Sequence, residues 1–171
     1  MAKKTVIGTL GKGKRGISTV GWMLRGAAAG AAASTALNAV TYLDMAVRGR
    51  GASSTPEDTV EKMADKAHVS IPGDEEAREN RKQGLGPLTG LVAGVGVGVL
   101  TGLVRASGYR SAKPVGIALT TVGVLVAANG PMTVLGVTDP RTWSATDWIS
   151  DLVPHFAYGV VVKTTMDAFD R

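Results

Sequence analysis

The chain has 171 residues, of which 19% are charged and 44% are hydrophobic, and it contains no cysteine. This composition excludes disulfide bonds and metal sites built on cysteine, and a charged share below the usual quarter favours a membrane protein over a soluble domain. The net charge of +5 is compatible with nucleic-acid binding. Because the basic residues cluster beside apolar segments, we instead interpret them as topology determinants and lipid-headgroup contacts, and predict no nucleic-acid partner.

Residues 1–21 are predicted to form a basic tail. The tail lacks the continuous apolar core and the small-residue cleavage site of a signal peptide. Gly11 to Gly16 match the dinucleotide-binding pattern G-x-G-x-x-G, but neither a strand before the match nor the required acidic residue after it is present. We therefore interpret the tail as a flexible basic segment that contacts anionic lipid, and we predict no cofactor.

The first membrane span is predicted at residues 22–46, within a membrane domain of residues 22–171. Its centre is the alanine-rich run GAAAGAAASTALNAVTYL, which is bracketed by Arg25 and Asp44. The run is short for a span, but Trp22 and Met23 add length if the Arg25 side chain extends toward the headgroups.

Residues 48–84 are predicted to form a polar loop that contains two helices. Thr55, Pro56 and the two acids that follow are typical of a helix start. Apolar residues then recur at positions 60, 63, 64 and 67, on one helical face. After a break at residues 71–73, a second helix is predicted to begin near Asp74 and to end near Gly84. We expect this helical hairpin to lie on the membrane surface or against a partner.

The second and third spans are predicted at residues 85–106 and 114–138. Both contain long runs without a charged side chain, and about 20 apolar residues are enough for a helix to cross a bilayer. Asn129, Gly130 and Pro131 interrupt the second of these runs. We favour a kink at this point, and the alternative is a broken helix that builds an ion or substrate site.

The fourth span is predicted at residues 148–169. Its uncharged stretch, residues 152–162, has only about 11 residues, fewer than the roughly 20 that a spanning helix needs. The segment can cross the membrane if Asp147 and Asp151 lie at one interface and Lys163 reaches toward the other.

Asp151 and His155 are the candidate functional residues, because they lie one helical turn apart inside this fourth apolar segment. An ionisable pair at membrane depth is a candidate for a proton or ligand site. The alternative is a pair that only stabilises the helix bundle through hydrogen bonds. The other histidine, His68, lies in the polar loop, so we predict no metal site.

Lysine and arginine predict the orientation. Basic residues are frequent in the tail and in the short loop after the second span, whereas the third loop contains only Arg141. This bias places both termini in the cytoplasm. The loop of residues 48–84 weakens the argument, because it contains seven basic residues together with many acids.

Small residues recur every four positions in the first two spans, and such faces let helix backbones approach closely. These candidate packing residues are Gly26, Gly30, Ser34, Gly90, Gly94, Gly98 and Gly102. We expect them to pack within this chain, and the alternative is a face for a second subunit.

The C-terminal third resembles a known family. Residues 135–140 read LGVTDP and are followed by Trp143, Trp148, Ser150 and His155. This pattern resembles the end of YagU-type bacterial inner-membrane proteins, and the whole chain resembles small multi-pass membrane proteins of actinobacteria. The resemblance implies a multi-helix protein of the bacterial inner membrane and an association with acid resistance.

We therefore predict an all-α integral membrane bundle of about four transmembrane helices, with a polar helical loop between the first and second. The predicted function is non-enzymatic: an accessory or scaffold subunit that packs against other membrane proteins or forms a homo-oligomer. The alternative is a small proton or solute permeation protein, or an acid-response protein, that uses His155 and Asp151. No catalytic residue is predicted.

Overall fold

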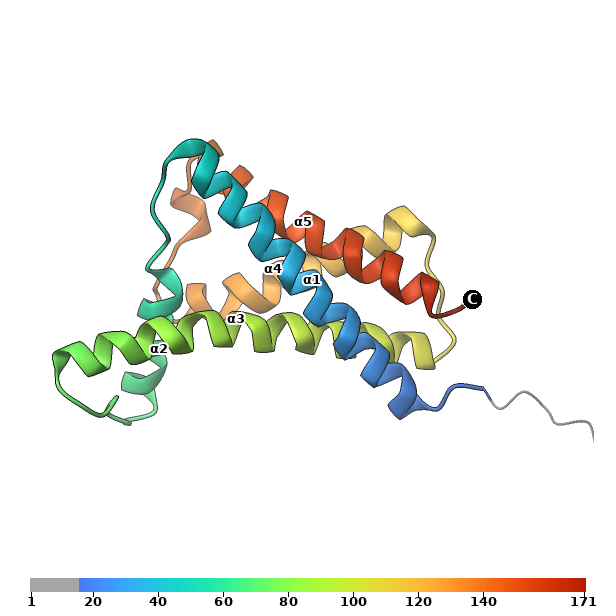
Figure 1. Ribbon diagram of the computed structural model, residues 1–171, viewed down its shortest axis with the longest axis horizontal. Helices are drawn as coiled ribbons and strands as arrows, with labels where there is room; N and C mark the ends of the chain where they lie inside the picture. Colours follow the sequence, from blue (N-terminus) through green and yellow to red (C-terminus); the bar gives the residue numbers. More distant parts are fainter. Residues whose placement is uncertain (1–15) are drawn as a thin grey trace, which may run out of the picture.

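The computed structural model describes residues 16–171, which form five α-helices, one short 3-10 helix and no strand (Figure 1). The elements are α1 (Thr19–Arg48), α2 (Thr55–Lys66), α3 (Glu75–Ala106), α4 (Lys113–Val134), η1 (Pro140–Thr142) and α5 (Ala145–Ala168). The prediction of an all-α fold is confirmed. Most of the predicted basic tail, including nearly all of the G-x-G-x-x-G match, lies outside the described residues.

Short polar side chains begin three of the long helices. Ser18 accepts a hydrogen bond from the backbone of α1, and Asp74 does the same for α3. Ser144 and Asp147 form a reciprocal capping box at the start of α5. These caps satisfy backbone N–H groups that have no partner inside the helix. The helix start predicted near Asp74 is therefore confirmed, and α5 begins three residues before the predicted fourth span because Ser144 caps it.

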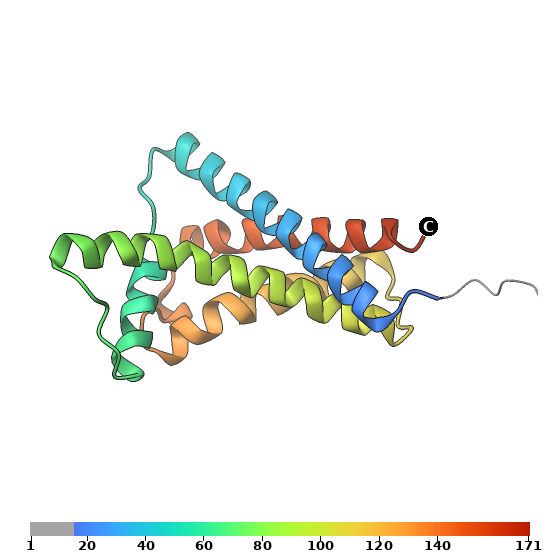
Figure 2. The same cartoon turned by 60° about the horizontal axis from the view of Figure 1, so that its bottom comes forward.

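The four long helices run alternately up and down, and α2 packs beside the first turns of α3 (Figures 1 and 2). Helix α1 packs against α3 and α5, while α4 completes the bundle against α5 and α3. We call the end that holds the start of α1 and the end of α5 the terminal end. The opposite end, which holds α2, is called the loop end.

Helices α1 and α3 cross near the terminal end at a contact between glycine residues. A Cβ atom placed on Gly98 would lie 2.7 Å from the Cα of Gly30 and would also overlap the carbonyl oxygen of Gly26. One turn further along, a Cβ on Gly94 would overlap the hydroxyl group of Ser34. Only glycine and other small residues let the backbones of α1 and α3 approach this closely. From this crossing the two helices diverge toward the loop end (Figure 2).

Two other glycines of the predicted stripe lie in different surroundings. Gly102 contacts the backbone of Trp22 at the start of α1, so it belongs to the same crossing. At Gly90 no heavy atom lies within 4 Å of an added Cβ, and the residue is exposed. Because α1 has already moved away from α3 at that level, Gly90 faces open space rather than a helix.

The predicted end of a helix near Gly84 is wrong, because α3 continues without interruption from Glu75 to Ala106. Pro87, inside this helix, removes only one backbone hydrogen bond. Gly86 packs against α2, where its Cβ position lies 3.0 Å from the backbone of Pro56. This tertiary contact stabilises the helix where the local sequence alone predicts a break.

Helix α4 likewise continues through residues 129–131 and ends at Val134, four residues before the predicted boundary. Gly136, just after it, has a positive φ of 72°, a conformation that glycine adopts without strain. The Asn-Gly-Pro sequence therefore lies inside the helix.

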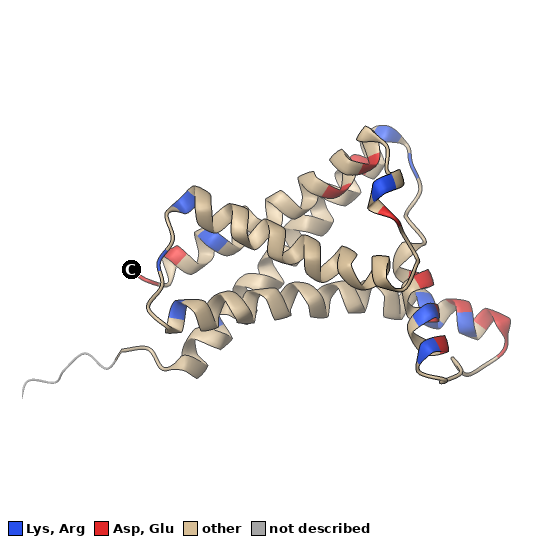
Figure 3. Cartoon of the chain, turned by 180° about the vertical axis from the view of Figure 1, so that it is seen from behind, with Lys and Arg blue, Asp and Glu red and all other residues tan. Residues whose placement is uncertain are grey.

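Charged residues gather at the two ends of the bundle, and its middle carries none (Figure 3). Two helices, α3 and α4, are long and apolar enough to cross a membrane. Only 22% of the apolar window of each is buried, unlike the core helix of a soluble protein, which is mostly buried. Helices α1 and α5 contain more polar residues and do not reach the same hydropathy, so the predicted four-span bundle is not established by composition.

Candidate functional site

Asp151 and His155, the candidate functional pair, lie on the inward face of α5 and meet a third polar residue from α4. His155 Nδ1 is 2.6 Å from the backbone oxygen of Asp151 and 3.4 Å from its carboxylate oxygen Oδ1. The second oxygen, Oδ2, accepts a hydrogen bond of 2.8 Å from Asn129 Nδ2. His155 is 9% exposed. Asn129, noted in the sequence only as an interruption of an apolar run, is thus part of this site.

Residues next to Asp151 in α5 connect the candidate site to α1. Pro154 has no backbone N–H, so it cannot donate to the carbonyl of Ser150 one turn earlier. The Ser150 hydroxyl accepts a hydrogen bond of 2.6 Å from Arg48, at the end of α1. This bond connects α1 to α5 at the loop end, on the same helical turn as Asp151.

The three residues border a cavity of about 580 Å³ that occupies the loop-end half of the bundle. It is lined by all four long helices and by the first residues of α2. The cavity exists because α1 diverges from α3 beyond their glycine crossing (Figure 2). Most of the exposed lining is apolar, with a small number of polar groups, which is typical of ligand pockets between the helices of a bundle.

A closed layer of side chains separates the cavity from the terminal end. Tyr158 is fully buried, and its hydroxyl donates a hydrogen bond of 2.5 Å to the carbonyl oxygen of Gly94. Beside it, Ser34 donates to the carbonyl oxygen of Gly30. Val162 and Met166, further along α5, are also fully buried. The cavity therefore ends at this layer.

Carboxylates are frequent around the cavity. Glu57, in the first turn of α2, borders it, and its Oε2 atom is buried without a hydrogen-bond partner. Asp147 also borders it. The pKa of Asp147 is lowered mainly by the hydrogen bond from the Ser144 hydroxyl and then by that from the Ser144 backbone, so this residue is negatively charged at neutral pH.

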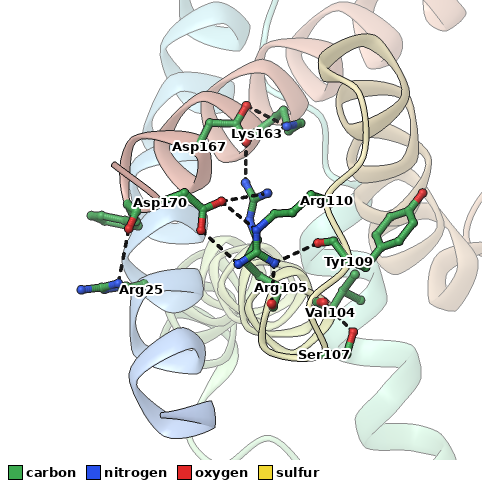
Figure 4. A network of polar contacts seen from close by, with 10 residues as sticks. Arg25, Val104, Arg105, Ser107, Tyr109, Arg110, Lys163, Asp167 and Asp170 are labelled. Carbon is green, nitrogen blue, oxygen red and sulfur yellow. Dashed lines mark hydrogen bonds and ion pairs between the residues drawn. The ribbon is translucent and has the colours of Figure 1, made fainter. Parts of the chain in front are cut away.

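The terminal end contains an ionic network that the sequence does not predict (Figure 4). Arg105, at the end of α3, is only 6% exposed and contacts Asp167 at 2.5 Å and Asp170 at 3.1 Å. Lys163 contacts the same Asp167 at 2.6 Å, and Arg110 reaches Asp170 at 3.0 Å. The network ties α3 and the loop that follows it to the end of α5.

From the sequence, Arg105 is one of the basic residues that set the orientation at the end of the second predicted span, and Lys163 is expected to extend toward the interface. The side chain of Lys163 is instead 7% exposed and packs against Gly116 of α4. The sequence signal for the network is the pair Asp167 and Asp170, one and two helical turns after Lys163. The spacing of residues within α5 does not show that these aspartates pair with arginines from another part of the chain.

Within residues 16–171, no group of three or more His, Asp or Glu side chains is placed to hold a metal ion. His68 is exposed in the loop after α2 and far along the chain from His155. Comparisons with protein-family models, curated proteins and solved structures each found no match to this chain. They therefore give no support to the resemblance between the C-terminal third and YagU-type proteins.

Proposed function

We propose that this chain is a non-enzymatic, multi-pass membrane protein whose four long helices cross the bacterial plasma membrane, and that it acts as an accessory or scaffold subunit. The observation that carries the membrane assignment is the apolar outer surface of the bundle. Each long helix has a strongly exposed apolar side chain: Leu24 at 67%, Val92 at 65%, Val126 at 64% and Ile149 at 61%. In water a continuous surface of this kind drives aggregation, whereas lipid solvates it.

The polar residues of α1 and α5 support four spans despite the lower hydropathy of these helices. Ser34, His155 and Lys163 are 7%, 9% and 6% exposed, so they lie inside the bundle. In membrane proteins polar side chains face the bundle interior and pair with one another. These three polar side chains are therefore removed from contact with lipid.

The distribution of charge supports an orientation with both termini in the cytoplasm. Lys and Arg determine orientation, and acidic residues contribute little. Six of the described basic residues belong to the terminal end: Arg25, Arg105, Arg110, Lys113, Lys163 and Arg171. The tail adds a further five, whereas eight belong to the loop end. The loop end also contains most of the acids (Figure 3).

The outer face of α1 supports a role beside other membrane helices. Its exposed positions include Ala28, Ala32, Thr35 and Ala39. A face of small residues lets the backbone of another helix approach closely. The proposed partners are other membrane subunits or a second copy of this chain.

A second candidate function uses the cavity with Asp151 and His155. Because the fully buried Tyr158 and Val162 close the cavity toward the terminal end, the geometry favours ligand binding over permeation. The two functions are compatible, since the cavity lies inside the bundle and the α1 face lies outside it.

Single-cysteine labelling tests the spans formed by α1, α3 and α4 directly, because the natural chain has no cysteine to interfere. Ile17→Cys and Ser107→Cys mark the terminal end, while Ser70→Cys and Ser144→Cys mark the loop end. In intact cells a membrane-impermeant maleimide should label only the loop-end pair. Labelling of all four after the cells are opened provides the control.

If Ile17 and Ser70 were labelled from the same side, α1 would not cross the membrane. If Ser107 and Ser144 were labelled from the same side, α4 would not cross the membrane. The subunit role is tested separately, by purification in mild detergent: a stable larger assembly that is lost on Ala32→Trp supports it, and a monomer with no partner contradicts it.

A further inference from the structure

We propose that the cavity at the loop end binds a small organic cation with an apolar body, such as a quaternary ammonium or phosphonium ion. The proposal rests on the second candidate function and assigns its ligand class. It depends on the shape, the charge and the unpaired groups of the cavity, and not on the accessory role.

The size and lining of the cavity fit a small organic molecule. Its volume of about 580 Å³ lies inside the range of ligand pockets. Apolar side chains such as Leu37, Leu91 and Met132 form much of the wall. An inorganic ion would leave this apolar surface without contacts, so an occupant with an apolar body is favoured.

The charge of the cavity selects a cation. Three carboxylates border it: Glu57, Asp147 and Asp151. In a site lined largely by apolar groups, charges interact more strongly than in water. A positively charged ligand would therefore be attracted, and an anion of the same size would be repelled.

The two arginines on the wall cancel only part of this charge, because both pair with Asp44. Arg50 Nε contacts Asp44 Oδ2 at 2.7 Å, and Arg48 contacts the other oxygen of the same carboxylate at 3.4 Å. Arg48 also donates to Ser150. Arg48, Arg50 and Asp44 together carry one net positive charge. This is smaller than the combined negative charge of the three carboxylates that border the cavity.

Glu57 provides a binding group that is not used within the chain. Its Oε2 atom is buried and accepts no hydrogen bond, which is costly for an ionised oxygen. A ligand cation in the cavity would compensate this charge. Tyr42 and Trp143 also border the cavity, and aromatic faces attract organic cations.

Binding of tetraphenylphosphonium to the full chain in detergent tests the proposal. Tetraphenylborate is the matched probe, because it has nearly the same shape and the opposite charge. Equilibrium dialysis should give saturable binding of the cation, at least about tenfold tighter than binding of the anion. Glu57→Gln and Asp151→Asn should each weaken cation binding by about tenfold, whereas Asp58→Asn, on the neighbouring exposed residue, should not.

Gly90→Phe provides a second test that does not depend on charge. An added side chain meets no atom there within 4 Å and enters the cavity, so the fold should tolerate it and binding should be lost. Gly96→Phe, on the same helix and equally open, should bind normally.

Equal affinity for the two probes, the absence of saturable cation binding, or unchanged binding by Gly90→Phe would overturn the proposal. These results are independent of the maleimide labelling pattern and of the assembly found in detergent. A failure of the cation site can therefore be distinguished from a failure of the membrane or subunit assignment.

Discussion

Replacement of Gly98 by alanine should destabilise the bundle, whereas replacement of Gly96 should not. An added Cβ at Gly98 would overlap the carbonyl oxygen of Gly26 and lie 2.7 Å from the Cα of Gly30. Carbon atoms in contact are normally separated by about 3.5–4.0 Å, so α1 and α3 would have to move apart by about 1 Å. At Gly96 nothing lies within 4 Å of the added atom.

The comparison isolates the steric effect. Both substitutions exchange glycine for alanine inside α3, so both gain the same helix propensity, up to about 1 kcal/mol in water. Overpacking at Gly98 opposes this gain by about 1–3 kcal/mol. Separation of α1 from α3 would also weaken contacts along the whole crossing, including that between Gly102 and Trp22. We therefore expect Gly98→Ala to be about 1–3 kcal/mol less stable than Gly96→Ala.

Equilibrium unfolding in mixed micelles, followed by tryptophan fluorescence, measures this difference. Trp22 is 6% exposed beside the crossing and reports on its separation. Substitution of Trp143 and Trp148 by phenylalanine in all variants leaves Trp22 as the only signal. Equal free energies of unfolding for the two alanine variants would refute the argument that backbone contact at Gly98 holds α1 against α3.

Two further predictions concern the ends of the bundle. Arg105→Met should lower the free energy of unfolding by about 2–3 kcal/mol, less than for a fully buried ion pair because its aspartate partners are about a third exposed. The exposed Arg141→Met should have almost no effect, and a similar loss for both would contradict this reasoning. Ser144→Ala should lower the melting temperature at pH 7, and the difference from wild type should shrink as the pH falls below about 4. The Ser144 hydrogen bonds lower the pKa of Asp147 in the folded state, so their contribution is present above the ordinary aspartate range and is lost when the carboxylate is protonated; a constant difference down to low pH would contradict this prediction.

The sequence determines much of the fold through local chemistry. Uncharged runs of about 20 residues predict the apolar parts of α3 and α4, because the length needed to cross a bilayer is fixed. The side chains of Asp74 and Ser144 begin α3 and α5, because a capping oxygen needs only the next turn of backbone. The pairing of Asp151 with His155 also follows from the sequence, since residues one turn apart share a helical face.

Only the tertiary structure determines how these elements meet. A periodic row of glycines predicts a close contact but not its partner or its extent. The structure places Gly98 against Gly26 and Gly30 and leaves Gly90 open, because the diverging axes of α1 and α3 bring only part of the row into contact. The same divergence forms the cavity, which no periodicity along one helix could indicate.

The polar contacts at both ends depend on the same geometry. Asn129 reaches Asp151 because α5 packs beside α4. Arg105 reaches Asp167, 62 residues away, because α3 and α5 both end at the terminal end of the bundle. Local propensity also predicts that α3 ends near Gly84, and packing of Gly86 on α2 overrides it. Local chemistry therefore determines where helices begin and which residues are apolar. Contacts between distant helices decide which polar groups are brought together, because their energies depend on distances that the sequence does not contain.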